Sequence, residues 1–432
     1  MIDINRFKNI FFKVNTQSIT ILAMLFLFIN AYLQVLFFNH TFMNVGANAD
    51  ETAYREFLNA TTDFSFSLVS NAQAQPYAFF GLLLNKFFQD AQFTNRLISL
   101  ISAVFLLLFL FRYYKKQKFT NLIQGNPFIS NLIVFNVLSS VLLVLSCHFV
   151  GTSDMISVAF ALPAFILLTE VLFYKKQHSV IIIGLLFALS FTSRPTFLIS
   201  LAAYLLSIVF IMRKQLFSKQ LIFVGLFFVA FTALINFSPI VNQGKIVLDI
   251  KTIAKETGTS WFEMNYLMAK KWDAGEIPNT QWLSSDDVIQ YKKEHPDFVF
   301  PKNYIDIMVN DTGMFTRQLL RMFGTSMYSS FRYMYMLFPF LLVFPFLKKK
   351  EEDLVVNKTV YFTLSFYFIS LLIFIISAIK LMEFRWMHIA IVFYAFYTIN
   401  ATKTISENKR IVLFNSVFVV GILFFILKML KG

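Results

Sequence analysis

Residues 180–212 read VIIIGLLFALSFTSRPTFLISLAAYLLSIVFIM, an apolar stretch with a single ionisable residue, Arg194. A helix needs about 20 apolar residues to cross the hydrocarbon core of a bilayer, so the stretch holds one long kinked span or two short ones. Pro195 lacks a backbone donor and favours a helix end just before it. We predict two spans, one from about Val180 and one from about Phe197 to Met212. A single span would invert the orientation of every later segment.

The composition places the whole chain in the same class. Of its 432 residues, 57% are hydrophobic and 14% are charged, whereas soluble domains carry about 25% charged residues. The formal net charge of +14 does not indicate nucleic-acid binding, because the basic residues form short clusters between apolar runs, as cytoplasmic loops do. The single cysteine, Cys147, excludes an intrachain disulfide. The sequence therefore predicts an all-α polytopic membrane protein.

The lysine clusters also predict the topology. About eleven spans, with the N-terminus cytoplasmic and the C-terminus outside, put every cluster on the cytoplasmic side. The first span, about 19–38, is too long for the apolar region of a signal peptide and is expected to be retained. The others are expected at about 96–111, 128–150, 155–173, from 180, 197–212, 221–240, 328–347, 360–379, up to 399, and to about 428. They divide the chain into an N-terminal transmembrane module (1–240), a large outer loop (241–327) and C-terminal transmembrane helices (328–432).

The first outer loop, 39–96, places two adjacent carboxylates, Asp50 and Glu51, shortly after the first span. Asp50 has the character of a helix N-cap ahead of an amphipathic stretch. A second amphipathic piece begins at Pro76, a suitable first helical position, and closes at Asp90. We expect it to lie along the outer membrane surface, with a short re-entrant segment as the alternative.

The large outer loop holds a charge-rich helix and a basic stripe. Residues 285–295 place a serine and two acids ahead of two lysines, the order that caps a helix and matches its dipole. Arg317 and Arg321 lie one turn apart in an amphipathic stretch from Asp311 to Phe323. We expect these arginines to face lipid headgroups, with the phosphate of a donor as the alternative ligand.

With this topology, unusual charged groups collect on the outer side, at the mouths of helices. Ionisable groups at membrane depth are costly and tend to mark functional sites. A carboxylate can take a proton from an attacking hydroxyl, and cations can stabilise a departing phosphate. The residues are Asp50, Glu51, Arg55, Arg96, Asp154, Arg194, Lys380, Glu383, Arg385 and His388.

The order of these features resembles the GT-C superfamily of integral membrane glycosyltransferases. The acidic pair in Ala49-Asp50-Glu51-Thr52-Ala53-Tyr54 and the amphipathic pieces behind it follow the family's first outer loop. The acid in Ser153-Asp154-Met155 corresponds to a second acid that the family often carries in its next outer loop. The stretch 184–196 is similar to the family's small-residue span that ends in a basic residue and proline.

A late element is similar to one branch of this family, the enzymes that use dolichol-phosphate mannose. Glu383-Phe384-Arg385-Trp386 resembles the branch's Lys-Glu-x-Arg-Phe element. The match is partial, because Leu381 and Met382 separate Lys380 from Glu383. The large loop lacks the Trp-Trp-Asp-Tyr-Gly signature of oligosaccharyltransferases, which argues against that branch.

The resemblance implies a mannosyltransferase-like enzyme of the cell envelope. It would move a sugar from a polyprenyl-phosphate carrier to a hydroxyl of a lipid-linked or protein acceptor at the outer membrane face, with inversion. The expected roles are catalysis for Asp50 as base, with Glu51 and Asp154 beside it; phosphate binding for Arg194, Arg385, Lys380 and Arg96; and support for Glu383 and His388. The plainer alternatives are helix caps for Asp50 and Asp154, snorkelling for Arg194, mutual pairing of Glu383 with Arg385, and core packing for His388.

Some expectations concern ligands, location and competing functions. A divalent metal, Mg or Mn, could bind oxygen ligands from Asp50, Glu51 and Asp154, although the sequence does not require one. Membrane lipids are expected partners and nucleic acid is not. A bacterial inner membrane is preferred, with the endoplasmic reticulum membrane as the alternative.

The competing hypotheses are a transporter or flippase, for which no internal repeat is visible, and an envelope polysaccharide ligase or polymerase. The glycosyltransferase hypothesis requires Asp50, Asp154, Arg194 and Arg385 to converge on one outer cavity.

Overall fold

The computed structural model describes residues 49–60, 74–116, 151–244, 259–278, 283–334, 354–377 and 384–401, with a few single positions between them. Every regular element among these residues is a helix and none is a strand, which confirms the all-α prediction. The helices are α3 (Ala49–Ala60), α5 (Gln75–Phe88), α6 (Ala91–Lys116), α8 (Asp154–Tyr174), α9 (Val180–Ser193), α10 (Phe197–Met212), η3 (Arg213–Gln215), α11 (Lys219–Ile235), α12 (Phe237–Gln243), α14 (Trp261–Asp273), α15 (Ser285–Glu294), α16 (Tyr304–Asn310), α17 (Thr312–Met334), α19 (Leu354–Ser377), η6 (Phe384–Met387) and α20 (His388–Ala401).

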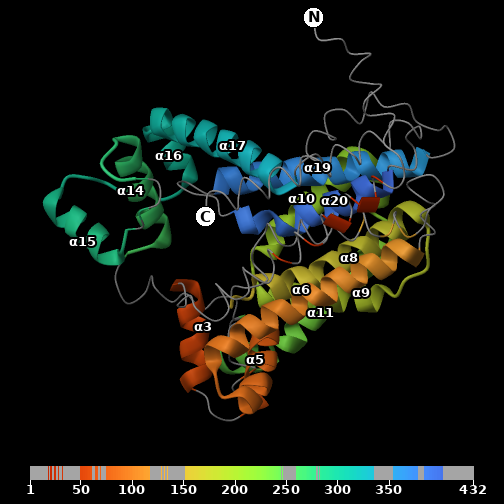
Figure 1. The fold of residues 1–432 in the computed structure, drawn as a ribbon. Coiled ribbons are helices and arrows are strands. Elements are labelled where there is room, and N and C mark those ends of the chain that lie inside the picture. Colours follow the sequence, from red (N-terminus) through yellow and green to blue (C-terminus); the bar gives the residue numbers. More distant parts are fainter. Residues whose placement is uncertain are drawn as a thin grey trace, which may run out of the picture.

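The bundle has two layers of long helices around α8. One layer runs α6, α8, α9 and α11 side by side, and the other contains α10, α19 and α20 (Figure 1). In the most apolar 18 residues of α8, 89% are buried, as expected for a helix that is apolar on every side. The ring of Phe165 on α8 packs against Phe187 in the first layer and against Tyr204 and Phe366 in the second, with ring centroids 4.7–5.6 Å apart.

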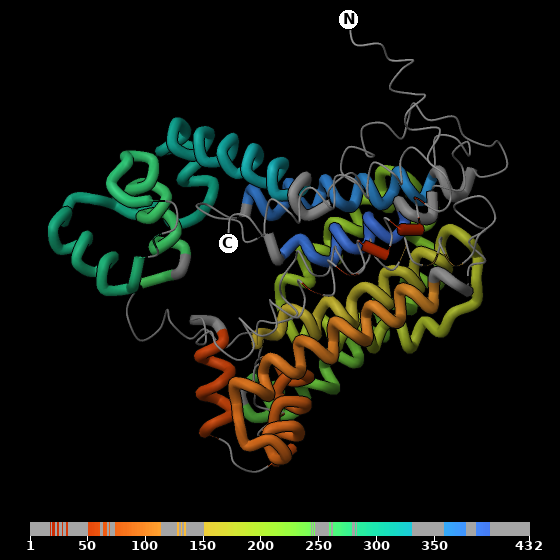
Figure 2. Tube along the Cα trace, in the orientation of Figure 1, coloured from red at the N-terminus to blue at the C-terminus, as the bar shows by residue number. Residues whose placement is uncertain are grey.

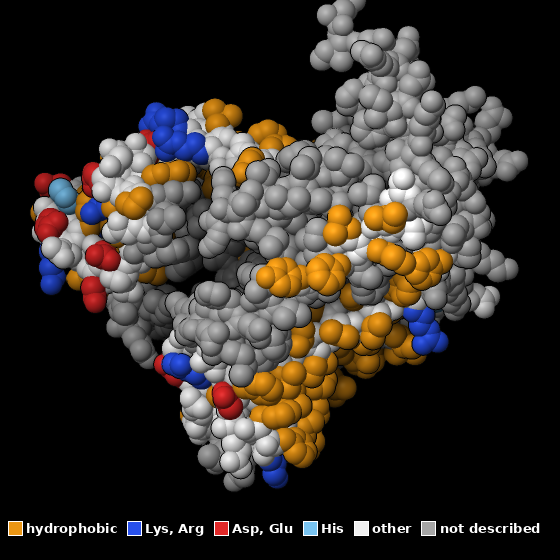
Figure 3. Space-filling model, in the orientation of Figure 1, with side chains coloured by type: hydrophobic (Ala, Val, Ile, Leu, Met, Phe, Trp, Pro, Cys, Tyr) orange, Lys and Arg blue, Asp and Glu red, His pale blue; other side chains and the backbone are white. Residues whose placement is uncertain are grey.

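Four of the described helices are long and apolar enough to cross a membrane: Ala91–Tyr113, Asp154–Tyr174, Phe197–Gln215 and Lys358–Ile376. Three shorter apolar helices, Val180–Ser193, Lys219–Ile235 and His388–Tyr397, lie in the same bundle. Hydrophobic side chains cover much of the visible described flank of the bundle (Figure 3). The chain is therefore a membrane protein by the length and composition of its helices. The prediction of about eleven spans is not confirmed. The predicted first, third and last spans lie almost wholly outside the described residues, and so does most of the predicted eighth span.

The predicted break at Arg194–Thr196 is present. Helix α9 ends at Ser193 and α10 begins at Phe197. The two helices have different partners, because α9 packs against α8 and α11 whereas α10 packs against α19. Gly184 lets α9 approach α11 closely, since a Cβ there would lie only 2.5 Å from the Cβ of Phe227. The predicted helix break is thus confirmed, whereas α9, with 14 residues, is shorter than the described helices that are long enough to cross a membrane.

A polar cluster lies between the C-terminal end of α8 and the start of α9. Glu170, buried in the last turns of α8, accepts hydrogen bonds from Lys176 at 2.6 Å and pairs with His178 at 2.8 Å. Both partners lie in the connection between α8 and α9, just before Ser179, which is the N-cap of α9. The connection is therefore held on α8 at the end far from Asp154.

Helices α14, α15, α16 and the start of α17 form a polar unit beside the bundle (Figure 2). Helices α14, α15 and α16 begin at side-chain caps, with complete capping boxes at Ser260 and Ser284. The N-cap of α15 is Ser284, one residue before the serine that opens the predicted helix. Helix α17 joins the predicted amphipathic stretch to the beginning of the predicted eighth span in one continuous helix, because neither proline nor a capping motif interrupts it.

Candidate functional site

Glu51 and Arg96 form a buried ion pair between α3 and the first turns of α6. The Nε of Arg96 donates to Oε1 of Glu51 at 2.9 Å, and its Nη2 donates to Oε2 at 3.1 Å. The two side chains are 4% and 2% exposed. Guanidinium and carboxylate are matched in this two-point geometry, the strongest form of such a pair. The pair therefore fixes α3 against the mouth of α6.

Gly151 completes the shell around Glu51. Its backbone N–H donates to Oε1 of Glu51 at 2.6 Å. A Cβ at this position would lie 2.6 Å from the Cβ of Asn95 and 3.1 Å from Oε1 of Glu51. Only glycine lets the backbone approach both groups so closely. The segment 151–154, which precedes α8, is thereby fixed against α3 and α6.

Asp154 opens α8 and forms the second acid–arginine pair. Its Oδ1 lies 2.6 Å from Nε of Arg194, which caps the C-terminus of α9. Its Oδ2 accepts a hydrogen bond from Thr152 at 2.8 Å. The predicted N-cap role of Asp154 is wrong: Ser153 occupies that position, and both carboxylate oxygens of Asp154 face Thr152 and Arg194. The Arg194 side chain is 19% exposed, so it remains reachable from outside.

Two tyrosines form a hydroxyl-bearing wall beside these pairs. The rings of Tyr54 on α3 and Tyr77 on α5 lie 4.7 Å apart. The Tyr54 hydroxyl bonds to Ser153 Oγ at 2.8 Å, and the Tyr77 hydroxyl donates to Oδ1 of Asn95 at 2.9 Å. Burial is the main cause that raises the pKa of Tyr77 well above its ordinary value, and the nearby Tyr54 and Glu51 raise it further. The phenol of Tyr77 therefore stays a proton donor. Four helices thus contribute polar groups to one site.

Asn95 adds an available donor to this site. Its side chain is 1% exposed, and its Nδ2 has no hydrogen-bond partner within the described part of the chain. Buried polar atoms in folded proteins are nearly always paired, so an unpaired one points to a missing acceptor. An oxygen-rich ligand would satisfy this amide. Asn95, Tyr54 and Tyr77 are not among the predicted site residues, since isolated polar residues in an apolar chain have no local signature.

The remaining predicted residues divide into described and undescribed positions. Asp50 lies in the first turn of α3, which begins at Ala49, two residues earlier than an N-cap at Asp50 would require. The structure describes the backbone of Asp50 and of Arg385, in η6, but not their side chains. Lys380 and Glu383 lie outside the described residues. His388, the first residue of α20, is 2% exposed, as the core-packing alternative expects.

Arg317 and Arg321 do not form a free basic stripe. Both bind Asp273 at the end of α14: Nη2 of Arg317 lies 2.6 Å from Oδ2, and Nη1 of Arg321 lies 3.1 Å from Oδ1. The hydrogen bond from Arg317 is the main cause that lowers the pKa of Asp273. This pairing joins α14 to α17. The two arginines are half exposed, yet Asp273 already offsets part of their charge.

The described acids do not fit a divalent metal. Both oxygens of Glu51 accept from Arg96, and both oxygens of Asp154 are engaged by Arg194 and Thr152. A metal would have to compete with these cations for the same oxygen atoms. No group of three or more His, Cys, Asp or Glu side chains in the described ranges could hold an ion. We therefore derive no step through a metal.

Protein-family models, curated proteins and solved structures were all compared with this chain, and none matches it.

Proposed function

We propose that this chain is a glycosyltransferase that moves a sugar from a polyprenyl-phosphate carrier to a hydroxyl of a lipid-linked or protein acceptor, with inversion. The observation that carries the proposal is the pair of acid–arginine contacts meeting at residues 151–154. They lie at the ends of two candidate spans, Ala91–Tyr113 and Asp154–Tyr174. A lipid-borne phosphate and a polar acceptor could both reach such a place.

Arg194 is the phosphate contact in this proposal. A phosphate oxygen can replace Asp154 on the guanidinium, because the Arg194 side chain is partly exposed. Asp154 then holds the arginine in place between turnovers. Lys380 and Arg385 supply further cations from the C-terminal helices. Positive charge at the leaving phosphate stabilises the transition state, in which that charge develops.

Glu51 and Arg96 have a positioning role in this proposal, which changes their expected assignments. Arg96 is 2% exposed and its guanidinium binds Glu51 at two points, so the pair holds α3 rather than the donor. Asp50, which directly precedes Glu51 on α3, is the base that takes the proton from the acceptor hydroxyl. A rigid α3 holds the backbone that carries Asp50 in place against residues 151–154.

The test is sugar transfer by the purified full chain in vesicles, with polyprenyl-phosphate sugars as donors. Removal of a general base lowers the rate by about 100-fold or more, so we expect that loss for Asp50→Asn. Glu56→Gln is the matched control, because Glu56 is an exposed acid on the same helix. Full activity of Asp50→Asn would exclude the proposed mechanism. Movement of lipid-linked sugar across the vesicle membrane without transfer would favour a flippase instead.

A further inference from the structure

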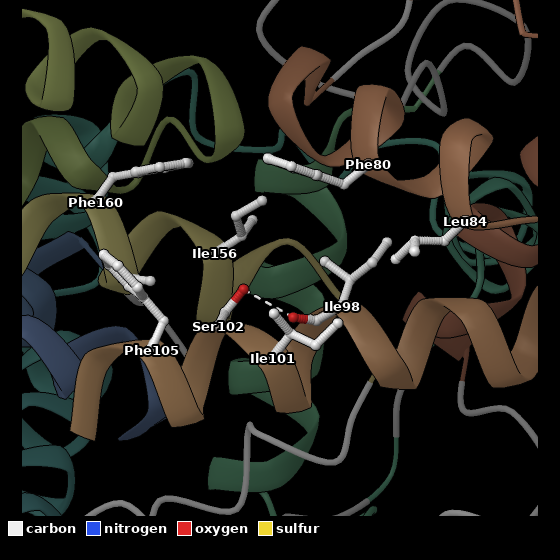
Figure 4. Close-up of a pocket in the computed structure, with 9 residues that line it drawn as sticks. Phe80, Leu84, Ile98, Ile101, Ser102, Phe105, Ile156 and Phe160 are labelled. Atoms are coloured by element: carbon white, nitrogen blue, oxygen red, sulfur yellow. Dashed lines mark hydrogen bonds between the residues drawn. The ribbon is translucent and has the colours of Figure 1, made fainter. Parts of the chain in front are cut away.

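An apolar groove runs between α5, α6 and α8, next to the polar site (Figure 4). Its volume is about 260 Å³. The floor is formed by Ile98, Ile156 and Ala159, each 3% exposed. Phe80, Ile101 and Phe105 stand at its mouth and are 40%, 50% and 54% exposed. The groove is thus open along one side and closed at its base.

The described residues that line the groove offer little to a polar ligand. Ser102 is the one polar side chain among them, and its hydroxyl donates back to the carbonyl of Ile98 at 2.8 Å (Figure 4). The helices α6 and α8 that line it are both candidate spans, so its open side faces hydrocarbon. An apolar space at that depth takes an apolar chain.

The groove and the polar site share residues. Ile98 and Ile156 pack on Tyr77, and the ring of Tyr77 packs against the tilted ring of Tyr54, whose hydroxyl bonds to Ser153. Phe105 lies nine residues beyond Arg96 on α6, which places the far end of the groove about 13 Å deeper along the helix. One molecule with a polar head and an apolar chain could therefore occupy both places.

The size of the groove restricts the kind of lipid. Pockets for whole drug-sized molecules run from about 300 to 1,000 Å³, so this groove accommodates only part of a lipid. A single chain can lie in it, whereas two acyl chains on one glycerol would compete for the space. Isoleucine and phenylalanine side chains on its walls also suit a chain that carries methyl branches.

We propose that this groove holds the isoprene units nearest the phosphate of the polyprenyl-phosphate carrier, with the phosphate towards Ser153 and Arg194. This rests on the proposed glycosyltransferase function and specifies where its lipid substrate enters. The rest of the chain extends into the bilayer past Phe105 and Phe160.

The test is photolabelling of the purified full chain in lipid nanodiscs with a polyprenyl phosphate that carries a benzophenone in its third isoprene unit. We expect the label on peptides from α5, α6 and α8, with competition by unlabelled polyprenyl phosphate. Ala159→Leu fills the floor and should abolish this labelling. Phe105→Ala removes a half-exposed wall and should weaken labelling about fivefold. Phe210→Ala is the matched control, because Phe210 is 71% exposed on α10 and should leave labelling unchanged.

The second arm uses a phosphatidylglycerol with a benzophenone in one acyl chain. Equal labelling of the same peptides by this probe would overturn the proposal, because the groove would then be a general lipid site. Polyprenyl label confined to other helices, or groove labelling unaffected in a folded Ala159→Leu variant, would also overturn it. In either case continued sugar transfer would leave the glycosyltransferase proposal intact. Groove labelling without any transfer would support the groove and contradict the glycosyltransferase.

Discussion

Two clusters in this protein have the same chemistry and opposite surroundings. In the bundle, Arg96 binds Glu51 at two points, and the side chains are 2% and 4% exposed. In the polar unit, Arg317 and Arg321 bind Asp273, and the arginines are 57% and 42% exposed. Each cluster joins the mouth or end of one helix to another helix. Only one of them is shielded from water.

The difference decides what each cluster contributes. A buried pair is expensive to form, but loss of one partner leaves an uncompensated charge inside the protein. An exposed pair is screened by water and salt, and its loss is nearly neutral. The Glu51 pair therefore makes α3 and the segment 151–154 dependent on each other. The Asp273 cluster orients α14 on α17, and it contributes little to the free energy of unfolding.

The largest effect is expected from Arg96→Met. Breaking a buried pair costs about 3–5 kcal/mol, because Glu51 keeps its charge without a cation beside it. The variant should show a much lower unfolding temperature in detergent, or fail to fold. The control is the double variant Glu51→Met, Arg96→Met, which removes both charges and should recover most of the loss. If the single and double variants unfolded at the same temperature, the buried charge would not be the cause.

An intermediate effect is expected from Gly151→Ala. The new methyl would meet Asn95 at 2.6 Å and push the segment away from Glu51. Overpacking of this kind costs about 1–3 kcal/mol, measured again as a drop in unfolding temperature. Gly225→Ala, inside α11, is the matched control, because nothing lies within 4 Å of a Cβ there. Alanine should raise stability at Gly225 by up to about 1 kcal/mol, and a loss equal to that of Gly151→Ala would contradict the close approach.

The smallest effect is expected from Asp273→Asn in the exposed cluster. The hydrogen bond from Arg317 lowers the pKa of Asp273 in the folded state. Its contribution is therefore present above the unfolded pKa of about 3.9 and is lost as the pH falls through the lower folded pKa. The difference in unfolding temperature between wild type and variant should be small at pH 7, smaller in high salt, and absent at the acidic end. Asp286→Asn, an exposed acid on α15, is the control; a difference that grew on acidification would contradict the pairing.

Local sequence signals located the helices well. Pro76 marked the start of α5, the Arg194-Pro195 pair marked the break between α9 and α10, and the apolar run after Asp154 marked α8. Each of these signals acts within a few residues, through backbone geometry or hydrophobicity. The continuity of α17 was missed, because amphipathic and apolar segments need no boundary between them when no residue breaks the helix.

The partners within the site could not be predicted. Glu51 and Arg96 are 45 residues apart, and Gly151 is 100 residues from Glu51. Nothing local shows which cation meets which acid, so Glu51 was expected as a helper of Asp50 and Arg96 as a phosphate contact. One signal was present: Arg96 opens an apolar helix, where a cation requires a carboxylate. The outer loop offered few acids, and Glu51 was among them.

The two polar clusters on α8 have a consequence for motion. Asp154 ties the N-terminal end of α8 to Arg194 at the end of α9, and Glu170 ties its C-terminal end to Lys176 and His178 just before α9 begins. A slide of α8 along α9 by even one residue, about 1.5 Å, would strain both clusters at once. We therefore expect α8 and α9 to move together. Any opening of the bundle would then fall to the neighbouring helices, α5, α10 and α19.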